Sequence, residues 1–236
     1  AVILFNAMTG YDENDLAMPL LSADFALEYR TVDLTGKRLG VLESFADNMF
    51  YQSALGLLSE NGATIVEVLL DYERSEGFSE LLGGEMVRDL ALYLESYSAD
   101  EVQIDSIASL RAFNNSDMDT RAPYGQGLVD MMDALEFSAA ELGSLADDLQ
   151  SGARAALQQL FNESNLDVLL SINNRHAGVA ALANFPALTI PMGYEASGRP
   201  IGLTLIAPSF REQDLIDIGA RFEQLSAARK MHEQYQ

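Results

Sequence analysis

The stretch that decides the fold is ANFPALTIPMGY (Ala183–Tyr194), followed after a short gap by GRPIGLTLIAP (Gly198–Pro208). The runs Ala187–Ile190 and Ile201–Ile206 carry no charged residue, which is typical of strands covered on both faces. They are separated by Glu195–Pro200, whose Gly and Pro favour a turn. The stretch therefore predicts two antiparallel strands that are neighbours inside a sheet.

Further strands are expected upstream. Lys37–Glu43 and Ala63–Leu70 flank an apolar helical segment, Asn48–Glu60, which stops at Asn61-Gly62. A strand, a helix and a strand of this length form one right-handed crossover, so these two strands should be parallel. With Leu166–Ile172 as a further strand, the sequence predicts an α/β fold: one mixed sheet covered by helices.

We expect residues 1–236 to form a single α/β domain with a helical insertion at residues 78–166. Ser98-Ala99-Asp100-Glu101 and Ser138-Ala139-Ala140-Glu141 have the form of helix-capping boxes. Ser209-Phe210-Arg211-Glu212 is expected to cap a closing helix whose apolar face carries Leu215, Ile218, Phe222 and Leu225. At the start of the chain, residues 1–8 are expected to complete a helix that Gly10 ends.

Composition excludes several functions. The net charge of −22 disfavours nucleic acid and anionic membrane surfaces as partners, since both require Lys and Arg. The absence of cysteine rules out disulfides and zinc–thiolate sites. No run of residues reaches the length of a membrane span, and the first residues lack a cationic leader. We expect a cytoplasmic protein, although a periplasmic or secreted one stays open because the true amino terminus is expected to be missing.

The quoted stretch resembles the carboxy-terminal hairpin of the amidase-signature hydrolases, which reads small-Gly-x-Pro-Ala-x-Thr-x-Pro-x-Gly and then Gly-x-Pro-x-Gly-Leu. The similarity continues through Ser209–Ala227, and Gly10–Asp15 matches a Gly-Tyr-Asp-x-x-Asp loop of the family. Phe113-Asn114-Asn115 through Gly125-Gln126 resembles the Phe-Asn…Phe-Gly-Gln of the peptide- and glutamyl-amidase-like branch. The resemblance implies an α/β/α amidase fold in which this chain is the carboxy-terminal portion.

Family members cleave amides with a Ser–Ser–Lys triad and need neither metal nor cofactor. That triad lies in their amino-terminal half, and this chain shows no Gly/Ser-rich nucleophile loop. Its two lysines, Lys37 and Lys230, lack the apolar surroundings that would turn a lysine into a base. We therefore expect no catalytic residue, metal site or cofactor site in this chain, and no amidase activity from the chain alone.

His176 is the first candidate for substrate binding, because it follows a predicted strand end, where α/β sheets place ligands. A nucleophile pair of Ser171 and His176 is conceivable, but two residues five apart on a loop have no evident reason to align. The sequence favours a histidine on the surface or at a pocket rim. In the family, prolines often follow this strand, and this chain departs from that pattern.

Four other residues are candidate substrate-binding residues. Tyr124 and Gln126 offer an aromatic ring and an amide beside a glycine, which suits recognition of a substrate amide, but Gln126 is equally typical of a solvated helix start. Asn184 stands where the family has glycine, and asparagine tolerates the left-handed conformation best among other residues. Phe185 would then border the acyl pocket, or it lies in a buried turn without ligand contact.

Three interpretations follow. The first is the carboxy-terminal part of an amidase that acts on a small amide substrate by serine-based acyl transfer, in which this chain supplies sheet and pocket wall. Its expected partner is the amino-terminal amidase half or a second copy of itself. The second is a non-catalytic acidic α/β domain that binds a ligand or partner, and the third is an inactive remnant.

Overall fold

The computed structural model describes residues 1–12, 25–72 and 77–231. Its contacts divide the chain into a first unit, residues 1–72 and 153–236, and a second unit, residues 73–152. The expected helical insertion overlaps the second unit, but the boundary falls inside the long helix α7 (Ala139–Ser164). The helices of the described ranges include none with both the length and the apolarity needed to cross a membrane.

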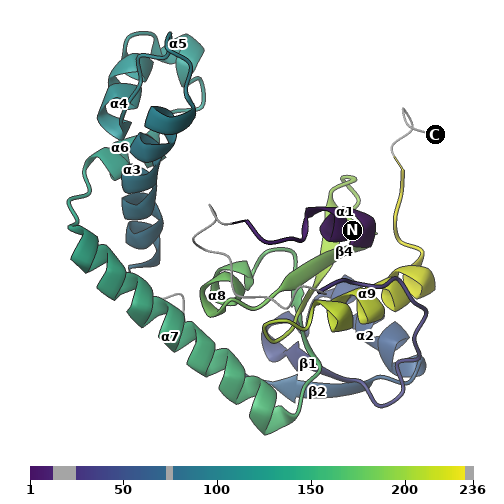
Figure 1. Cartoon of the computed structure of the whole chain (residues 1–236). Helices are drawn as coiled ribbons and strands as arrows, with labels where there is room; N and C mark the ends of the chain where they lie inside the picture. Colours follow the sequence, from purple (N-terminus) through teal and green to yellow (C-terminus); the bar gives the residue numbers. More distant parts are fainter. Residues whose placement is uncertain (13–24, 73–76, 232–236) are drawn as a thin grey trace. The chain divides into compact units, whose positions relative to one another are not determined.

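The first unit is built on a mixed sheet in the order β2-β1-β3-β5-β4 (Figure 1). Its strands are β1 (Arg38–Leu42), β2 (Thr64–Val68), β3 (Val168–Ile172), β4 (Ala187–Tyr194) and β5 (Pro200–Ile206). β1 pairs in parallel with β2 and β3, whereas β5 pairs antiparallel with β3 and β4. The expected α/β class, the parallel first pair and the antiparallel last pair are all confirmed.

The strand β4 is longer than the sequence indicated. Pairing continues past Pro191 through a β-bulge to Tyr194, which pairs with Pro200 at the start of β5. A proline ends a central strand because it has no N–H to donate, but β4 lies at the edge of the described sheet, where proline and a bulge are both tolerated. The pairing of β4 with β5 therefore runs to the turn, where Gly198 has a φ of +85°.

Two helices cover one face of the sheet. α2 (Met49–Glu60) begins at Asn48, whose Oδ1 accepts hydrogen bonds from the backbone N–H groups of Phe50 and Tyr51 at 3.1 and 3.0 Å. α9 (Glu212–Ser226) buries the expected Leu215, Ile218 and Phe222, while Leu225 is half-buried. α2 contacts α9, and α9 packs on β4.

The chain reaches β4 from β3 through a short helix, α8 (Ala177–Ala183). β3 and β4 are parallel to each other because each pairs antiparallel with β5. A right-handed crossover in this direction places α8 on the face opposite α2. There the end of α7 meets the segment that follows α8: Phe161 packs edge-on against Phe185, with ring centres 5.7 Å apart.

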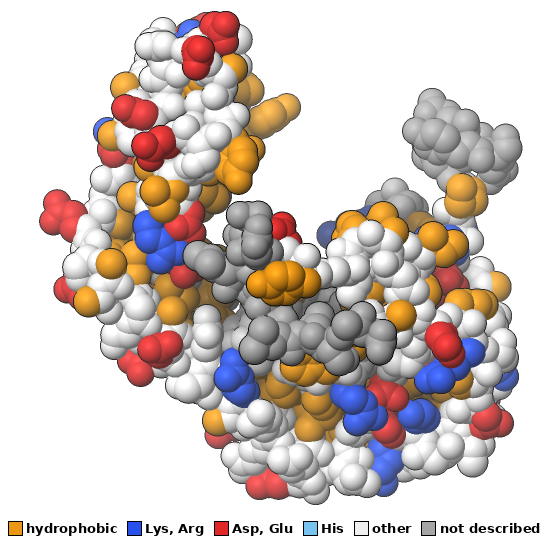
Figure 2. Space-filling view, viewed as in Figure 1, with side chains coloured by type: hydrophobic (Ala, Val, Ile, Leu, Met, Phe, Trp, Pro, Cys, Tyr) orange, Lys and Arg blue, Asp and Glu red, His pale blue; other side chains and the backbone are white. Residues whose placement is uncertain are grey.

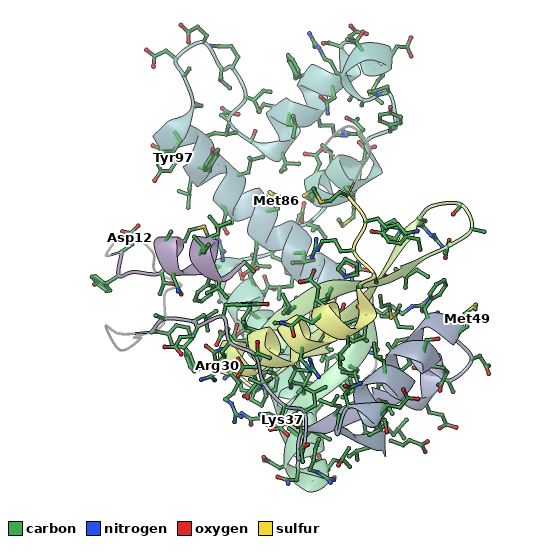
Figure 3. All side chains as sticks on the ribbon, turned by 90° about the vertical axis from the view of Figure 1, so that its right-hand side faces the viewer. Asp12, Arg30, Lys37, Met49, Met86 and Tyr97 are labelled. Carbon is green, nitrogen blue, oxygen red and sulfur yellow. The ribbon has the colours of Figure 1, made fainter. Side chains whose placement is uncertain are left out.

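The chain before β1 is attached to α9 by charged side chains. Arg30 donates two hydrogen bonds from Nε and one from Nη2 to the carboxylate of Asp217, at 2.9 to 3.1 Å. Lys37 forms ion pairs with Asp214 and Asp167. Figure 3 labels Arg30 and Lys37 on the side of the first unit where α9 lies.

The second unit is helical. It contains α3 (Phe78–Tyr97), α4 (Ile107–Asn115), α5 (Met118–Arg121), α6 (Gly127–Asp133) and the first part of α7. α3 packs closely because it has glycine at the contacts: a Cβ at Gly84 would lie 2.5 Å from Leu142 of α7. Leu142 of α7 is therefore buried in the core of this unit.

The capping predictions had mixed outcomes. Ser138 and Glu141 form the expected reciprocal box at the start of α7. The box at Ser98 was wrong, because Ser98 ends α3 and the next helix starts after Ser106, which has its own box with Ser109. Ser209 does not cap α9 either; its hydroxyl donates to the carbonyl of Asn184 instead, because Phe210 takes a φ of +64° and turns the chain away.

The first helix, α1 (Val2–Met8), has the expected extent, but Gly10 does not end it through a left-handed conformation. Its C-cap is Thr9 in an extended conformation, and Gly10 does not adopt a positive φ. The Gly10–Asp15 loop that matches the family lies outside the described residues from position 13 onward.

Candidate functional site

The carboxyl end of β3 carries a serine–histidine pair. Ser171 is the fourth residue of β3, and His176 lies just before α8. The turn between them, in which Asn173 takes a φ of +52°, brings Ser171 Oγ to 2.7 Å from His176 Nδ1. The expectation that these two residues would not align was wrong, because the left-handed Asn173 folds the chain back over the strand end.

Burial lowers the pKa of His176, and the positive charge of the neighbouring Arg175 lowers it further. The imidazole is therefore neutral at pH 7, and Nδ1 accepts a hydrogen bond from the hydroxyl of Ser171 when the ring proton is on Nε2. The edge of the ring packs against Phe45, with centroids 5.7 Å apart. This arrangement fixes the turn after β3.

Ser171 has no exposed surface. It pairs with Thr204 of β5, and its hydroxyl is held by the imidazole of His176. A nucleophile must reach a substrate carbonyl at about 3 Å, which a fully buried hydroxyl cannot do in this conformation. The pair has the hydrogen bond typical of a nucleophile and its base, but a substrate has no access to the Ser171 hydroxyl.

Asn184 and Phe185 lie at the other end of α8. Asn184 ends the helix with a φ of +57°, the left-handed conformation that the sequence suggested for it. Phe185 is buried against Phe161. The seven-residue helix between His176 and Asn184 spans about 10 Å. The structure therefore does not bring His176 together with Asn184 and Phe185 at one point.

Tyr124 and Gln126 belong to the second unit, where they line a cavity of about 650 Å³. Gln126 Nε2 donates to Asn115 Oδ1 at 2.8 Å and to Asp130 Oδ1 at 3.3 Å. Its Oε1 is buried and accepts no hydrogen bond from the described residues. Tyr124 beside it is fully exposed. A buried acceptor without a donor in a cavity fits a ligand that brings an N–H group.

The sequence did not indicate the role of Arg121, which lines this cavity. Arg121 lies over the ring of Phe113, with 3.7 Å between the guanidinium carbon and the ring centre, and Nη1 donates to the Phe113 carbonyl at 2.6 Å. The signal available in the sequence was the spacing of Arg121 and Phe113 across an Asn- and Asp-rich loop. That spacing alone does not specify stacking.

Another cavity, of about 380 Å³, lies in the first unit at the carboxyl ends of β1 and β3. None of the five predicted binding residues lines it. Its walls are the segment after β1, the turn after β3 and the β4–β5 hairpin; the lining residues are Ser44, Phe45, Asp47, Asn48, Ile172, Asn173, Arg175, Glu195, Arg199 and Ile201.

The two lysines do not form a catalytic site in the described part of the chain. Lys37 lies between the carboxylates of Asp214 and Asp167, at 3.2 and 3.6 Å, and Lys230 lies 4.9 Å from the ring centre of Tyr194. The ammonium group of Lys37 is thus engaged by two carboxylates. No described serine is hydrogen-bonded to either lysine.

These features define an α/β protein with a mixed sheet and a helical second unit, and comparisons identify its class. No protein-family model matches the chain. It is 26% identical over 243 residues to a probable amidase of Arabidopsis thaliana, covering 98% of this chain and 47% of the relative.

Two solved structures are similar throughout the chain. An amidase family protein from Bacillus anthracis matches with a TM-score of 0.87 and 28% identity, covering 98% of this chain and 47% of that one. The peptide amidase of Stenotrophomonas maltophilia matches with a TM-score of 0.82 and 25% identity, covering 98% and 52%. The chain belongs to the amidase-signature family, and it spans about half the length of these relatives.

Proposed function

We propose that the chain is the carboxy-terminal part of an amide hydrolase, in which it supplies the sheet and one wall of the substrate pocket. The observation that carries the proposal is the match to amidase structures along 98% of the chain, with a TM-score of 0.87, in a chain that covers only 47% of the matched protein. The positions of Ser171, Lys37 and Lys230 support the proposal that this chain supplies no catalytic group, because none of them is a usable nucleophile or base.

The chemistry of the complete protein would be acyl transfer. A serine outside this chain attacks the carbonyl carbon of the amide, the C–N bond breaks as the amine takes up a proton, and water then hydrolyses the acyl-enzyme. The residues of this chain would bind and orient the substrate rather than react with it.

Gln126 is the residue whose contribution we define most closely. Its Nε2 is held by Asn115 and Asp130, so the amide is fixed in orientation, and its buried Oε1 has no hydrogen-bond donor among the described residues. A substrate amide N–H would supply that donor once the cavity wall shifts to expose the oxygen. Tyr124 would cover the ligand from solvent. In the first unit, Asn184 and Phe185 are proposed as substrate-binding residues at one end of α8, and His176 at the other end.

Ammonia release from small primary amides tests the proposal. The 236-residue chain should show no turnover, and the same chain extended by an upstream catalytic half should hydrolyse amides. In the extended protein, Gln126→Leu should raise KM by about tenfold or more, since it removes a hydrogen bond to a buried acceptor. Ser171→Ala should leave kcat within a small factor. Turnover by the 236-residue chain that Ser171→Ala abolishes would contradict the proposal.

A further inference from the structure

The cavity after β1 and β3 lies where α/β sheets bind ligands. From β1 the chain crosses through α2 to β2, toward one edge of the sheet. From β3 it crosses through α8 to β4, toward the opposite edge. The two parallel neighbours β1 and β3 therefore form a topological switch point, where the connections leave in opposite directions and a crevice opens at the carboxyl ends of the strands. The cavity of about 380 Å³ occupies this position.

Two of the four charged side chains around the cavity neutralise each other. Arg199 donates from Nε and Nη2 to the two carboxylate oxygens of Glu195, at 2.8 and 2.5 Å. This pairing across the hairpin turn lowers the pKa of the Glu195 carboxyl. Arg199 and Glu195 therefore close one side of the cavity without adding net charge.

Arg175 and Asp47 are the other two charged side chains. Neither forms an ion pair of 4 Å or less with a described residue, although both line the same cavity. The guanidinium of Arg175 lies 5.9 Å from the ring centre of Phe45. The cavity thus presents one positive and one negative group that are separated from each other, above an apolar floor of Phe45, Ile172 and Ile201.

We propose that this cavity binds a small zwitterion of the amino-acid type, with its carboxylate on Arg175, its ammonium on Asp47 and an apolar side chain on the floor. A guanidinium binds a carboxylate through two parallel hydrogen bonds. The charge of the whole chain, −22, repels a simple anion but acts little on a ligand of zero net charge. The site does not depend on amide cleavage, because no group proposed for that reaction lines it.

Calorimetric titration of the 236-residue chain with three matched ligands tests the proposal. L-Leucine carries both charges, 4-methylpentanoate lacks the ammonium and 3-methylbutylamine lacks the carboxylate. L-Leucine should bind at least about tenfold more tightly than either of the others, since each loses one charge-assisted contact. Equal binding of 4-methylpentanoate, or no saturable binding of L-leucine at millimolar concentrations, would overturn the proposal.

Variants locate the site. Arg175→Gln and Asp47→Asn should each weaken L-leucine binding by about tenfold or more, and Arg175→Gln should also abolish the difference between L-leucine and 3-methylbutylamine. Arg229→Gln removes an exposed arginine of the same unit that lies outside this cavity, and it should leave binding unchanged. Circular dichroism shows whether each variant is folded. A folded Arg175→Gln variant with unchanged affinity would refute the assignment.

Discussion

At the scale of single residues, the pair of Ser171 and His176 makes the stability of the turn after β3 dependent on pH. The folded-state pKa of His176 lies below its ordinary value of 6.5, first through burial and then through Arg175. The unfolded chain therefore takes up a proton more readily than the folded one. The contribution of neutral His176 to the free energy of unfolding is fully present above about pH 6.5. It is lost as the pH falls from there toward the folded-state pKa.

Chemical denaturation between pH 5 and pH 8 measures this effect. The free energy of unfolding should decrease toward pH 5, and His176→Gln should remove a part of that decrease. His232→Gln changes the second histidine of the chain and is the matched control, which should keep the pH dependence. An identical pH profile in His176→Gln and the parent chain would show that His176 titrates equally in both states.

At the scale of elements, the start of α2 depends on one side chain. Asn48→Ala removes the acceptor for two backbone N–H groups and should lower the free energy of unfolding by about 1 kcal/mol. Asn48→Ser keeps a capping oxygen and should cost only a fraction of that, as measured by urea unfolding. A loss of the same size in both variants would assign the effect to something other than the cap.

The contact of α9 with β4 depends on the absence of a side chain. A Cβ at Gly219 would lie 2.6 Å from Ile190 Cδ1 and 2.9 Å from Leu188 Cδ2. Alanine gains about 1 kcal/mol over glycine in a helix, but overpacking costs about 1–3 kcal/mol, so Gly219→Ala should be neutral or destabilising by up to about 2 kcal/mol.

Gly56 of α2 provides the matched control in the same unit, because a Cβ there meets no atom within 4 Å. Gly56→Ala should stabilise the first unit by about 0.5–1 kcal/mol in the same urea experiment. If Gly219→Ala stabilised by as much as Gly56→Ala, the packing of α9 on β4 would be looser than described.

At the scale of the whole molecule, exposed apolar side chains favour association. Large apolar residues are exposed in both units, among them Ile3 and Leu69 in the first and Tyr97 and Leu128 in the second. Figure 3 labels Met86 and Tyr97 on α3, and Figure 2 shows orange apolar side chains on the surface of the helical unit. The edge strands β2 and β4 of the described sheet also carry unpaired backbone groups, which can template pairing with another chain.

We therefore propose that the chain associates with an amino-terminal amidase half or, in its absence, with a second copy. Sedimentation velocity of the 236-residue chain should show a species larger than the 25.8 kDa monomer at micromolar concentration. Addition of a catalytic half should convert that species to a one-to-one complex. A compact monomer that binds no hydrophobic dye would contradict the proposal.

The sequence by itself determined the five strands and two of their pairings, β1 with β2 and β4 with β5, because strand runs without charges, the turn at Glu195–Pro200 and the crossover length are local patterns. It also determined that Asn184 takes a left-handed conformation, since few other residues replace glycine there. The Ser98 box failed because α3 continues to Tyr97, and a helix that is already running overrides a capping pattern at its end.

Only the tertiary structure decided which side chains meet. Contact between Ser171 and His176 depends on the fold of a five-residue turn, and separation of His176 from Asn184 depends on α8 lying between them. The cavity with Arg175 and Asp47 joins three segments far apart in the sequence, which no local pattern places together. Local propensity acts over a few residues, whereas a site is made by long-range packing, so the sequence predicts the scaffold and the three-dimensional fold selects the site.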